Sequence, residues 1–220
     1  MPLGPALRSL MNPAMERRLS GMYRRIFVDL EQLSEVLLPH LPHSARILDI
    51  GGGDGELLNH LLRARPDLTI DMVDIAPVVG KFIQPDHARK VRKFTRTPVE
   101  DLPAENTGYD IALISDVMHH LPADYRETFL QSIRARLRND GCLLIKDIEP
   151  GHAISSLSLF CDMYVSGDKG VSLIPLQELE FLCERLEPTS MSEIGLLKID
   201  RPNYALRVVF GGFVNQSSAE

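Results

Sequence analysis

This 220-residue sequence contains no cluster of cysteines. Its three cysteines, Cys142, Cys161 and Cys183, lie far apart, and no two of them form a C-x-x-C pair. Disulfide frameworks and structural zinc sites need cysteines at short, regular spacings, so the sequence predicts neither of them. Free cysteines of this kind suit a reducing compartment, and we expect the protein in the cytoplasm.

Long apolar runs and a positive charge balance are missing as well. No apolar segment approaches the roughly 20 residues of a membrane helix, and the N-terminal residues lack the apolar core of a secretory signal, so we expect no membrane partner. The formal net charge is −6, whereas a long polyanion binds to a basic face. One basic cluster consists of His87, Arg89, Lys90, Arg92, Lys93 and Arg96. We interpret this cluster as a solvated loop, and no nucleic-acid partner is predicted.

Strand-like and helix-like apolar runs alternate from Arg46 onward. Five short runs predict strands, and two runs near the C-terminus predict an antiparallel closing pair. The five are 46–50, 69–74, 91–95, 109–115 and 142–147, and the pair is 190–197 with 203–210. This alternation predicts an α/β fold with a seven-stranded, mostly parallel sheet whose last strand is antiparallel.

Helical periodicity marks three further segments. Apolar residues recur at steps of three or four over 19–37, 125–137 and 176–186. The first segment belongs to residues 1–43, which we expect to form a helical cap over a ligand cleft or to pair with a second copy in a homodimer. Residues 44–220 are predicted to form the main domain.

A glycine turn joins the first predicted strand to a helix, in Arg46-Ile-Leu-Asp-Ile-Gly-Gly-Gly-Asp-Gly-Glu56. Gly51, Gly53 and Gly55 permit positive φ angles and a close approach of the backbone to a ligand. Backbone N–H groups at the helix start would face an anionic group. The spacing is G-x-G-x-G, whereas a dinucleotide turn would need glycine in place of Glu56, so a nicotinamide cofactor is the lesser interpretation.

With Asp49 before these glycines and Asp74 ending the second predicted strand, the sequence resembles the class I, Rossmann-like S-adenosylmethionine (AdoMet)-dependent methyltransferases of small molecules. The resemblance implies that fold and AdoMet as the cofactor. It also implies that the glycine turn holds the methionine end and that Asp74 accepts the ribose hydroxyls, with Asp49 and Ile75 as further cofactor contacts. A carboxylate suits that role because it accepts two O–H bonds at once. The alternative for Asp74 is a turn residue before Pro77.

The segment after the third predicted strand, Pro98-Val-Glu-Asp-Leu-Pro103, is similar to the family segment that lines adenine. Val99 and Glu100 are therefore predicted to contact the cofactor, and so is Ser115 at the end of the fourth strand. Pro98 stands where the family usually has an aspartate, so Glu100 or a backbone group must contact the adenine amino group. Alternatively, Glu100 is an ordinary loop acid.

The segment Ser115-Asp-Val-Met-His-His-Leu121 resembles small-molecule methyltransferases and lacks the Asn/Asp-Pro-Pro-Tyr/Phe and Pro-Cys motifs of enzymes that methylate base or glutamine nitrogens and cytosine carbon. The resemblance places Asp116 and His119 toward the substrate. His119, and after it Asp147, are the candidates for a general base. Asp116 and Asp147 resemble the two acids that bind Mg²⁺ in catechol-type methyltransferases. Ile148 stands where those enzymes have an Asn ligand, so no metal is predicted.

An insertion at about 150–175 carries apolar and aromatic residues that suit a substrate wall, although core packing would explain them equally well. The pocket candidates are Tyr23, Phe160, Met163 and Tyr164. We expect an enzyme that methylates a small organic acceptor, at an oxygen of an aromatic or polyketide-like secondary metabolite. Methylation at carbon or nitrogen and a non-catalytic AdoMet-binding partner protein are the alternatives.

Overall fold

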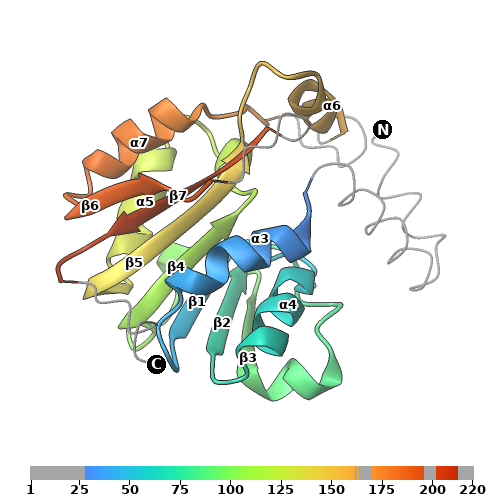
Figure 1. Ribbon diagram of the computed structural model, residues 1–220, viewed down its shortest axis with the longest axis vertical. Coiled ribbons are helices and arrows are strands. Elements are labelled where there is room, and N and C mark those ends of the chain that lie inside the picture. The colour runs from blue at the N-terminus through green and yellow to red at the C-terminus, as the bar shows by residue number, and fades with distance from the viewer. Residues whose placement is uncertain (1–27, 162, 164–169, 196–201, 213–220) are drawn as a thin grey trace.

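The structure is a computed structural model that describes residues 28–161, 163, 170–195 and 202–212. Its seven strands form one sheet in the order β3-β2-β1-β4-β5-β7-β6 (Figure 1). The strands are β1 Arg46–Ile50, β2 Thr69–Asp74, β3 Val91–Thr95, β4 Tyr109–Ser115, β5 Leu137–Ile148, β6 Ser190–Glu193 and β7 Asn203–Val209. β1 to β5 are parallel, and β7 runs antiparallel to β5 and to β6. This architecture confirms the predicted α/β fold with its antiparallel last strand.

Helices cover both faces of the sheet. The α-helices are α3 Leu30–Leu37, α4 Glu56–Ala64, α5 Arg126–Arg134, α6 Ala153–Cys161 and α7 Leu176–Glu184, and the 3₁₀ helices are η1 Leu38–His40, η2 Pro85–Lys90, η3 Val99–Asp101 and η4 Met118–His120. α3 and α4 pack with Ile47, Ile70 and Ile111 on one face. α5 and α7 pack on the other face, against the alternate residues of the same strands. Because side chains alternate along a strand, each central strand supplies both cores.

Several features of the elements differ from the sequence prediction. α5 ends at Arg134, and Leu137 already belongs to β5, where it pairs with Tyr109. Leu137 is buried in the same core as α5, so its helical spacing persists although the helix has ended. β6 ends at Glu193 rather than at 197. The connections from β2 to β3 and from β3 to β4 contain only η2 and η3, so the predicted alternation with helices fails there.

The described part of the N-terminal region, α3, packs against α4 and the sheet. Figure 1 shows α3 lying across the strands beside α4. The cap and the homodimer contact predicted for residues 1–43 depend largely on residues 1–27, which lie outside the described residues. Among the described helices, none combines the length and apolar character needed to cross a bilayer.

The topological switch point lies between β1 and β4. These strands are neighbours in the sheet, while the chain continues from β1 to β2 on one side and from β4 to β5 on the other. In open α/β sheets, ligands bind beyond the carboxyl ends of the strands at such a point. The glycine turn follows β1 and the Asp116–His119 segment follows β4, so the fold brings both predicted ligand segments together.

Candidate functional site

The turn after β1 has the backbone geometry that its glycines predict. The φ angles are +68° at Gly51, +54° at Gly53 and +83° at Gly55, in the region that favours glycine. The Gly51 N–H donates to Val73 O at 2.8 Å, and Gly55 is the N-cap of α4. The turn thus connects β1, β2 and α4 at the carboxyl edge of the sheet.

The middle glycine of the turn, Gly52, was not singled out from the sequence, yet it has the least space. A Cβ atom there would lie 1.8 Å from Asp49 Oδ2 and 2.8 Å from Met72 Cε. A Cβ atom at Gly51 would lie 2.4 Å from Val117 Cγ2, so the loop after β4 touches the glycine turn. At Gly53 the nearest atom would be Gly51 O at 3.9 Å. Gly53 therefore leaves room for a ligand against the main chain.

Asp49 is a buried acid with an unused oxygen. The residue is 2% exposed, and its Oδ2 accepts no hydrogen bond from the described residues. Burial raises the pKa of Asp49 to about 7, and the negative charge of Asp74 adds to the rise. A buried carboxylate without a partner is costly, so this oxygen suits a positively charged or N–H-bearing ligand group above the turn.

Asp74 lies where the sequence places it, beside the glycine turn. Its Oδ2 accepts from the Gly53 N–H at 3.2 Å, and its Oδ1 accepts from the Ala76 N–H at 2.8 Å. These bonds fix the carboxylate at the end of β2 and keep one lone pair of each oxygen for hydroxyl groups. The next residue, Ile75, is 74% exposed and forms an apolar surface next to the acid.

Val99 and Glu100 lie on η3, after β3. Val99 is buried at 3% exposure, so its side chain packs in the core and only its main chain can line a ligand. Glu100 accepts a hydrogen bond from the Tyr125 hydroxyl. Burial and this bond raise the pKa of Tyr125 to about 12, so the phenol remains a donor. Tyr125 was predicted only as a helix residue, and no sequence signal pairs it with Glu100.

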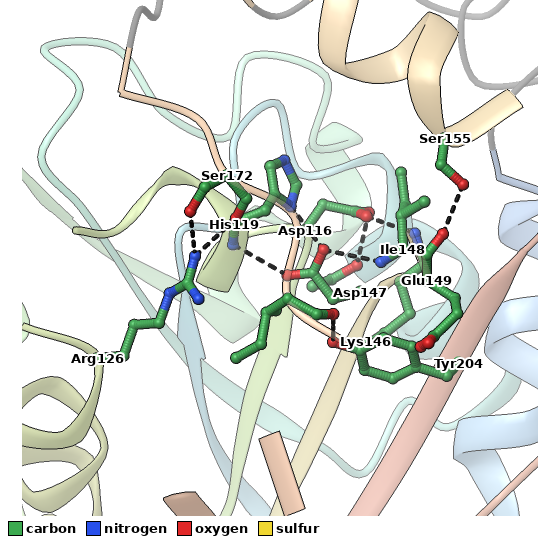
Figure 2. A network of polar contacts seen from close by, with 12 residues as sticks. Asp116, His119, Arg126, Lys146, Asp147, Ile148, Glu149, Ser155, Ser172 and Tyr204 are labelled. Carbon is green, nitrogen blue, oxygen red and sulfur yellow. Dashed lines mark hydrogen bonds and ion pairs between the residues drawn. The ribbon is translucent and has the colours of Figure 1, made fainter. Parts of the chain in front are cut away.

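His119, on η4 after β4, and Asp147, the second-to-last residue of β5, form a buried pair (Figure 2). Nδ1 of His119 lies 2.6 Å from Asp147 Oδ1, and the two side chains are 3% and 0% exposed. The His119 main-chain N–H donates to Asp147 Oδ2 at 3.3 Å. Burial alone would raise the pKa of Asp147, but the charge and hydrogen bond of His119, with the Ile148 N–H, hold it below its ordinary value. Because a carboxylate only accepts, Nδ1 carries a proton in this contact, and Nε2 is the basic nitrogen whenever the ring is neutral.

A second charge pair lies beside this one, between Asp116 and Lys146. Lys146 Nζ is 2.5 Å from Asp116 Oδ1, and the lysine side chain is 1% exposed. Asp116 has a φ of +58°, a conformation that costs a non-glycine residue energy. The Asp116 N–H donates to Lys146 O at 3.0 Å, and Ser115 Oγ donates to Asp116 Oδ2 at 3.3 Å. Lys146 therefore holds Asp116 in a strained position at the switch point, as ligand sites often do.

Asp116, His119 and Asp147 each offer a ligand-type atom, and these atoms lie within 4.8 Å of one another. A divalent cation here would compete with the Lys146 ammonium at Asp116 and with the His119 Nδ1 contact at Asp147. The arrangement satisfies these acids with protein cations and N–H groups. The prediction that the protein uses no metal here stays a prediction.

Of the four residues predicted to line the substrate pocket, two belong to the described residues. Phe160, on α6, is 55% exposed, and Met163 is half-buried. Tyr23 and Tyr164 lie outside the described residues. α6 buries Ser155 and Ser158, and Ser155 Oγ donates to Glu149 O at 2.5 Å. Leu157 of the same helix is 47% exposed, and Figure 1 shows α6 beyond the end of β5.

Two polar residues that sequence reasoning missed, Arg126 and Ser172, lie next to His119. Arg126 is 2% exposed, and its Nη2 donates to the carbonyl and hydroxyl oxygens of Ser172. The Ser172 N–H donates to His119 O at 2.8 Å. An arginine at a helix start gives no signal of burial in the sequence, because only the packing of α5, α7 and residues 170–175 encloses it.

Comparisons with known proteins agree with this fold. A family model described as a methyltransferase domain matches residues 21–187. A curated relative, N-terminal Xaa-Pro-Lys N-methyltransferase 1 of Bos taurus, is 31% identical over 103 residues, which are 46% of this chain and 46% of the relative. The chain therefore spans about half the length of the curated relatives it matches.

Solved structures share the fold at low sequence identity. An O-methyltransferase family protein of Burkholderia thailandensis has a TM-score of 0.63 and 18% identity, over 84% of this chain and 55% of that one. The 1,6-didemethyltoxoflavin-N1-methyltransferase of the same organism, crystallised with 1,6-didemethyltoxoflavin and S-adenosylhomocysteine, has a TM-score of 0.60 and 22% identity, over 82% and 77%.

Proposed function

The chain belongs to the methyltransferase-domain family, and from this premise we propose that it transfers a methyl group from AdoMet to a small organic acceptor. The accepting atom that we propose is an oxygen of an aromatic or polyketide-like metabolite. The single observation that carries the proposal is the buried His119–Asp147 pair, which lies next to the glycine turn through the loop after β4.

The residues of the turn fit AdoMet chemically. AdoMet is a positively charged sulfonium that also carries an ammonium group, a ribose and an adenine. Asp49 offers a buried carboxylate oxygen to the positively charged end, and the open space at Gly53 admits a ligand to the main chain. Asp74 offers two acceptor oxygens to ribose hydroxyls, and the exposed Ile75 offers an apolar surface to adenine. Ser115, Val99 and Glu100 complete the proposed cofactor contacts.

The His119–Asp147 pair suits an acceptor that must lose a proton. Bound AdoMet supplies an electrophilic methyl group, and the protein supplies alignment and a base. A phenol has an ordinary pKa near 10, so it is a poor nucleophile until its proton is removed. His119 Nε2 accepts that proton, and the Asp147 carboxylate stabilises the imidazolium that results. Lys146 keeps Asp116 in position to orient the acceptor at the same edge of the sheet.

The acceptor site is proposed to lie between this pair and the 150–175 insertion. Phe160 and Met163 would form its apolar wall, whereas Tyr23 and Tyr164, predicted with them, lie outside the described residues. An apolar wall with a few polar groups is the usual character of a small-molecule site. The Asn/Asp-Pro-Pro-Tyr/Phe motif is absent from the segment after β4, which supports a metabolite over a nucleic-acid base.

Methylation of an amine is a second candidate, because the curated relative at 31% identity is named for N-methylation of a protein N-terminus. A neutral amine needs no base, so loss of the His119 base would affect an N-methyltransferase little. Methylation of a carbon atom, and AdoMet binding by a partner protein that does not catalyse transfer, are weaker candidates.

The test is to incubate the full chain with AdoMet and a panel of phenols, amines and short peptides, and to follow S-adenosylhomocysteine formation. Turnover of phenols supports the proposal. Turnover of amines or peptides alone would instead support the second candidate, methylation of an amine. AdoMet binding without turnover of any acceptor would favour a non-catalytic partner protein, and absence of AdoMet binding would reject the whole proposal.

A further inference from the structure

Ser172 contacts both His119 and Arg126 through all of its polar groups. It lies in residues 170–175, here called the strap, which form the last part of the insertion and lead into α7. The Ser172 N–H donates to His119 O at 2.8 Å, and its carbonyl and hydroxyl oxygens accept from Arg126 Nη2 at 2.6 and 2.7 Å (Figure 2). A change in the Arg126 contact therefore reaches the His119 main chain through one residue.

The burial of Arg126 is expensive for a purely structural residue. Its side chain is 2% exposed, and its carboxylate partner Glu178 is 47% exposed and 2.9 Å away. Its Nε has no hydrogen-bond partner among the described residues. Replacing a buried ion pair by apolar residues is often neutral or stabilising, so stability alone does not explain a guanidinium here. The two bonds to Ser172 are what an apolar side chain could not supply.

His119 needs an external support because its local structure is short. It lies on η4, a three-residue 3₁₀ helix, and its ring is held by Asp147 at 2.6 Å. Asp147 restrains the ring and the N–H of His119, whereas the strap restrains its carbonyl. Together these contacts hold the residue at its ring, its N–H and its carbonyl.

The far end of the strap is anchored independently of Arg126. The Tyr204 hydroxyl donates to Ile174 O at 2.9 Å, and the Leu176 N–H donates to Glu149 Oε2 at 2.8 Å. Tyr204 is a permanent donor, since burial, with the negative charge of Asp147 next, raises the pKa of its phenol. Loss of the Arg126 contact should therefore release the end of the strap at His119 and leave the end at α7 in place.

We propose that Arg126 is a positioning residue, which acts through Ser172 to fix His119 in the orientation that accepts the proton of the acceptor. This inference rests on the proposed function for its catalytic part, whereas the effect on His119 itself does not depend on turnover. Misplacing a reacting group by about 1 Å can lower a rate by roughly 100-fold.

The experiment compares Arg126→Met, which keeps the apolar stem, with Arg126→Lys and with Arg185→Met as a matched control. Arg185 pairs with Glu127 at 2.7 Å and also joins the end of α7 to α5, but it does not touch the strap. Ser172→Ala, which removes only the hydroxyl contact, is the milder second variant. Folding is checked by thermal unfolding and by calorimetric binding of S-adenosylhomocysteine.

The structural readout is the Nδ1 proton of His119, followed by NMR in protein with ¹⁵N-labelled histidine and assigned by its loss in His119→Asn. Its exchange with water should become at least about tenfold faster in Arg126→Met, the equivalent of about 1.4 kcal/mol of lost protection. Turnover should fall by about 10- to 100-fold with cofactor affinity unchanged. Arg126→Lys should restore part of both, and Arg185→Met should change neither.

The outcomes separate the two proposals. If Arg126→Met and Ser172→Ala match Arg185→Met in His119 proton exchange, the inference is overturned, whatever the wild type turns over. If the wild-type protein methylates no acceptor but Arg126→Met still accelerates the exchange, the positioning holds and the proposed function fails. If exchange accelerates while turnover of a good acceptor stays within about twofold, His119 is positioned by Arg126 but is not the base, and the catalytic part of the inference is overturned.

Discussion

The carboxylate of Asp49 lies directly against Gly52: a Cβ atom at this glycine would lie 1.8 Å from Oδ2. The acid is buried, and the glycine is the residue that covers it. The main chain can pass over the Asp49 carboxylate at this position only because Gly52 has no side chain. The contact between the two residues therefore constrains the shape of the turn.

Substitutions at two neighbouring glycines should therefore have different effects. Gly52→Ala should destabilise the fold by about 3 kcal/mol or more, because the new methyl group overlaps Asp49 and Met72. Gly53→Ala should cost about 1–2 kcal/mol for its positive φ and keep the fold, while lowering S-adenosylhomocysteine affinity at least about tenfold. Thermal unfolding and calorimetry separate the two effects. Wild-type affinity in a folded Gly53→Ala variant would show that the ligand does not touch this turn.

The raised pKa of Asp49 makes stability depend on pH. The folded protein binds this proton up to a pH of about 7, whereas the ordinary value is 3.8. The resulting stability is fully present below 3.8 and is lost as the pH rises through about 7, at roughly 1.4 kcal/mol per pKa unit. Urea unfolding at about pH 5.5 and about pH 8 should show a smaller pH difference in Asp49→Asn than in the wild type. Equal pH dependence in both proteins would mean that Asp49 is not protonated in this range.

The same proton should leave when a positively charged ligand binds. A cation next to Asp49 favours its ionised form, so AdoMet binding near pH 7 is expected to release a fraction of one proton. Calorimetry in two buffers of different ionisation enthalpy measures this release, and Asp49→Asn should abolish it. Equal heats in both buffers for the wild type would place the positive charge of the ligand away from Asp49.

Asp74→Asn should weaken AdoMet binding by about 1.5–3 kcal/mol, because it replaces a charged acceptor of ribose hydroxyls with a neutral amide. The amide keeps one oxygen for a main-chain N–H, so the turn should remain folded. Asp67→Asn is the matched control, since Asp67 precedes β2 and bonds Ser44 and Arg65 at the opposite end of that strand. An unchanged dissociation constant for Asp74→Asn would reject the role of Asp74.

His119→Asn should lower turnover by about 10²- to 10⁴-fold and leave S-adenosylhomocysteine affinity within about threefold. The asparagine amide can donate to Asp147 in place of Nδ1 and so avoids a buried, unpaired carboxylate, but it cannot accept a proton. His87→Asn controls for the exchange itself, because the His87 ring lies at Asn59, away from Asp147. Rates that stay the same would indicate an amine acceptor that needs no base.

Local patterns account for the parts of the fold that the sequence predicted. β1 to β4 begin and end at the predicted residues. β1, β2 and β4 are mostly buried runs bounded by turns, whereas β3 is a largely exposed edge strand. The predicted end of α5 was wrong. Leu137 is apolar and buried, and this pattern does not distinguish the end of a helix from the start of a strand. The glycine turn and Asp74 were found because glycine conformation and strand ends are local properties.

The kind of sheet, the glycine turn and the residue types at the strand ends follow from the amino-acid sequence, since these features depend on neighbours along the chain. Tertiary packing is what brings Asp49 against Gly52, His119 to Asp147 28 positions away, and Arg126 to Ser172 46 positions away. Such contacts depend on how strands and helices pack, and burial then sets the pKa of Asp49 and the cost of leaving Arg126 unpaired.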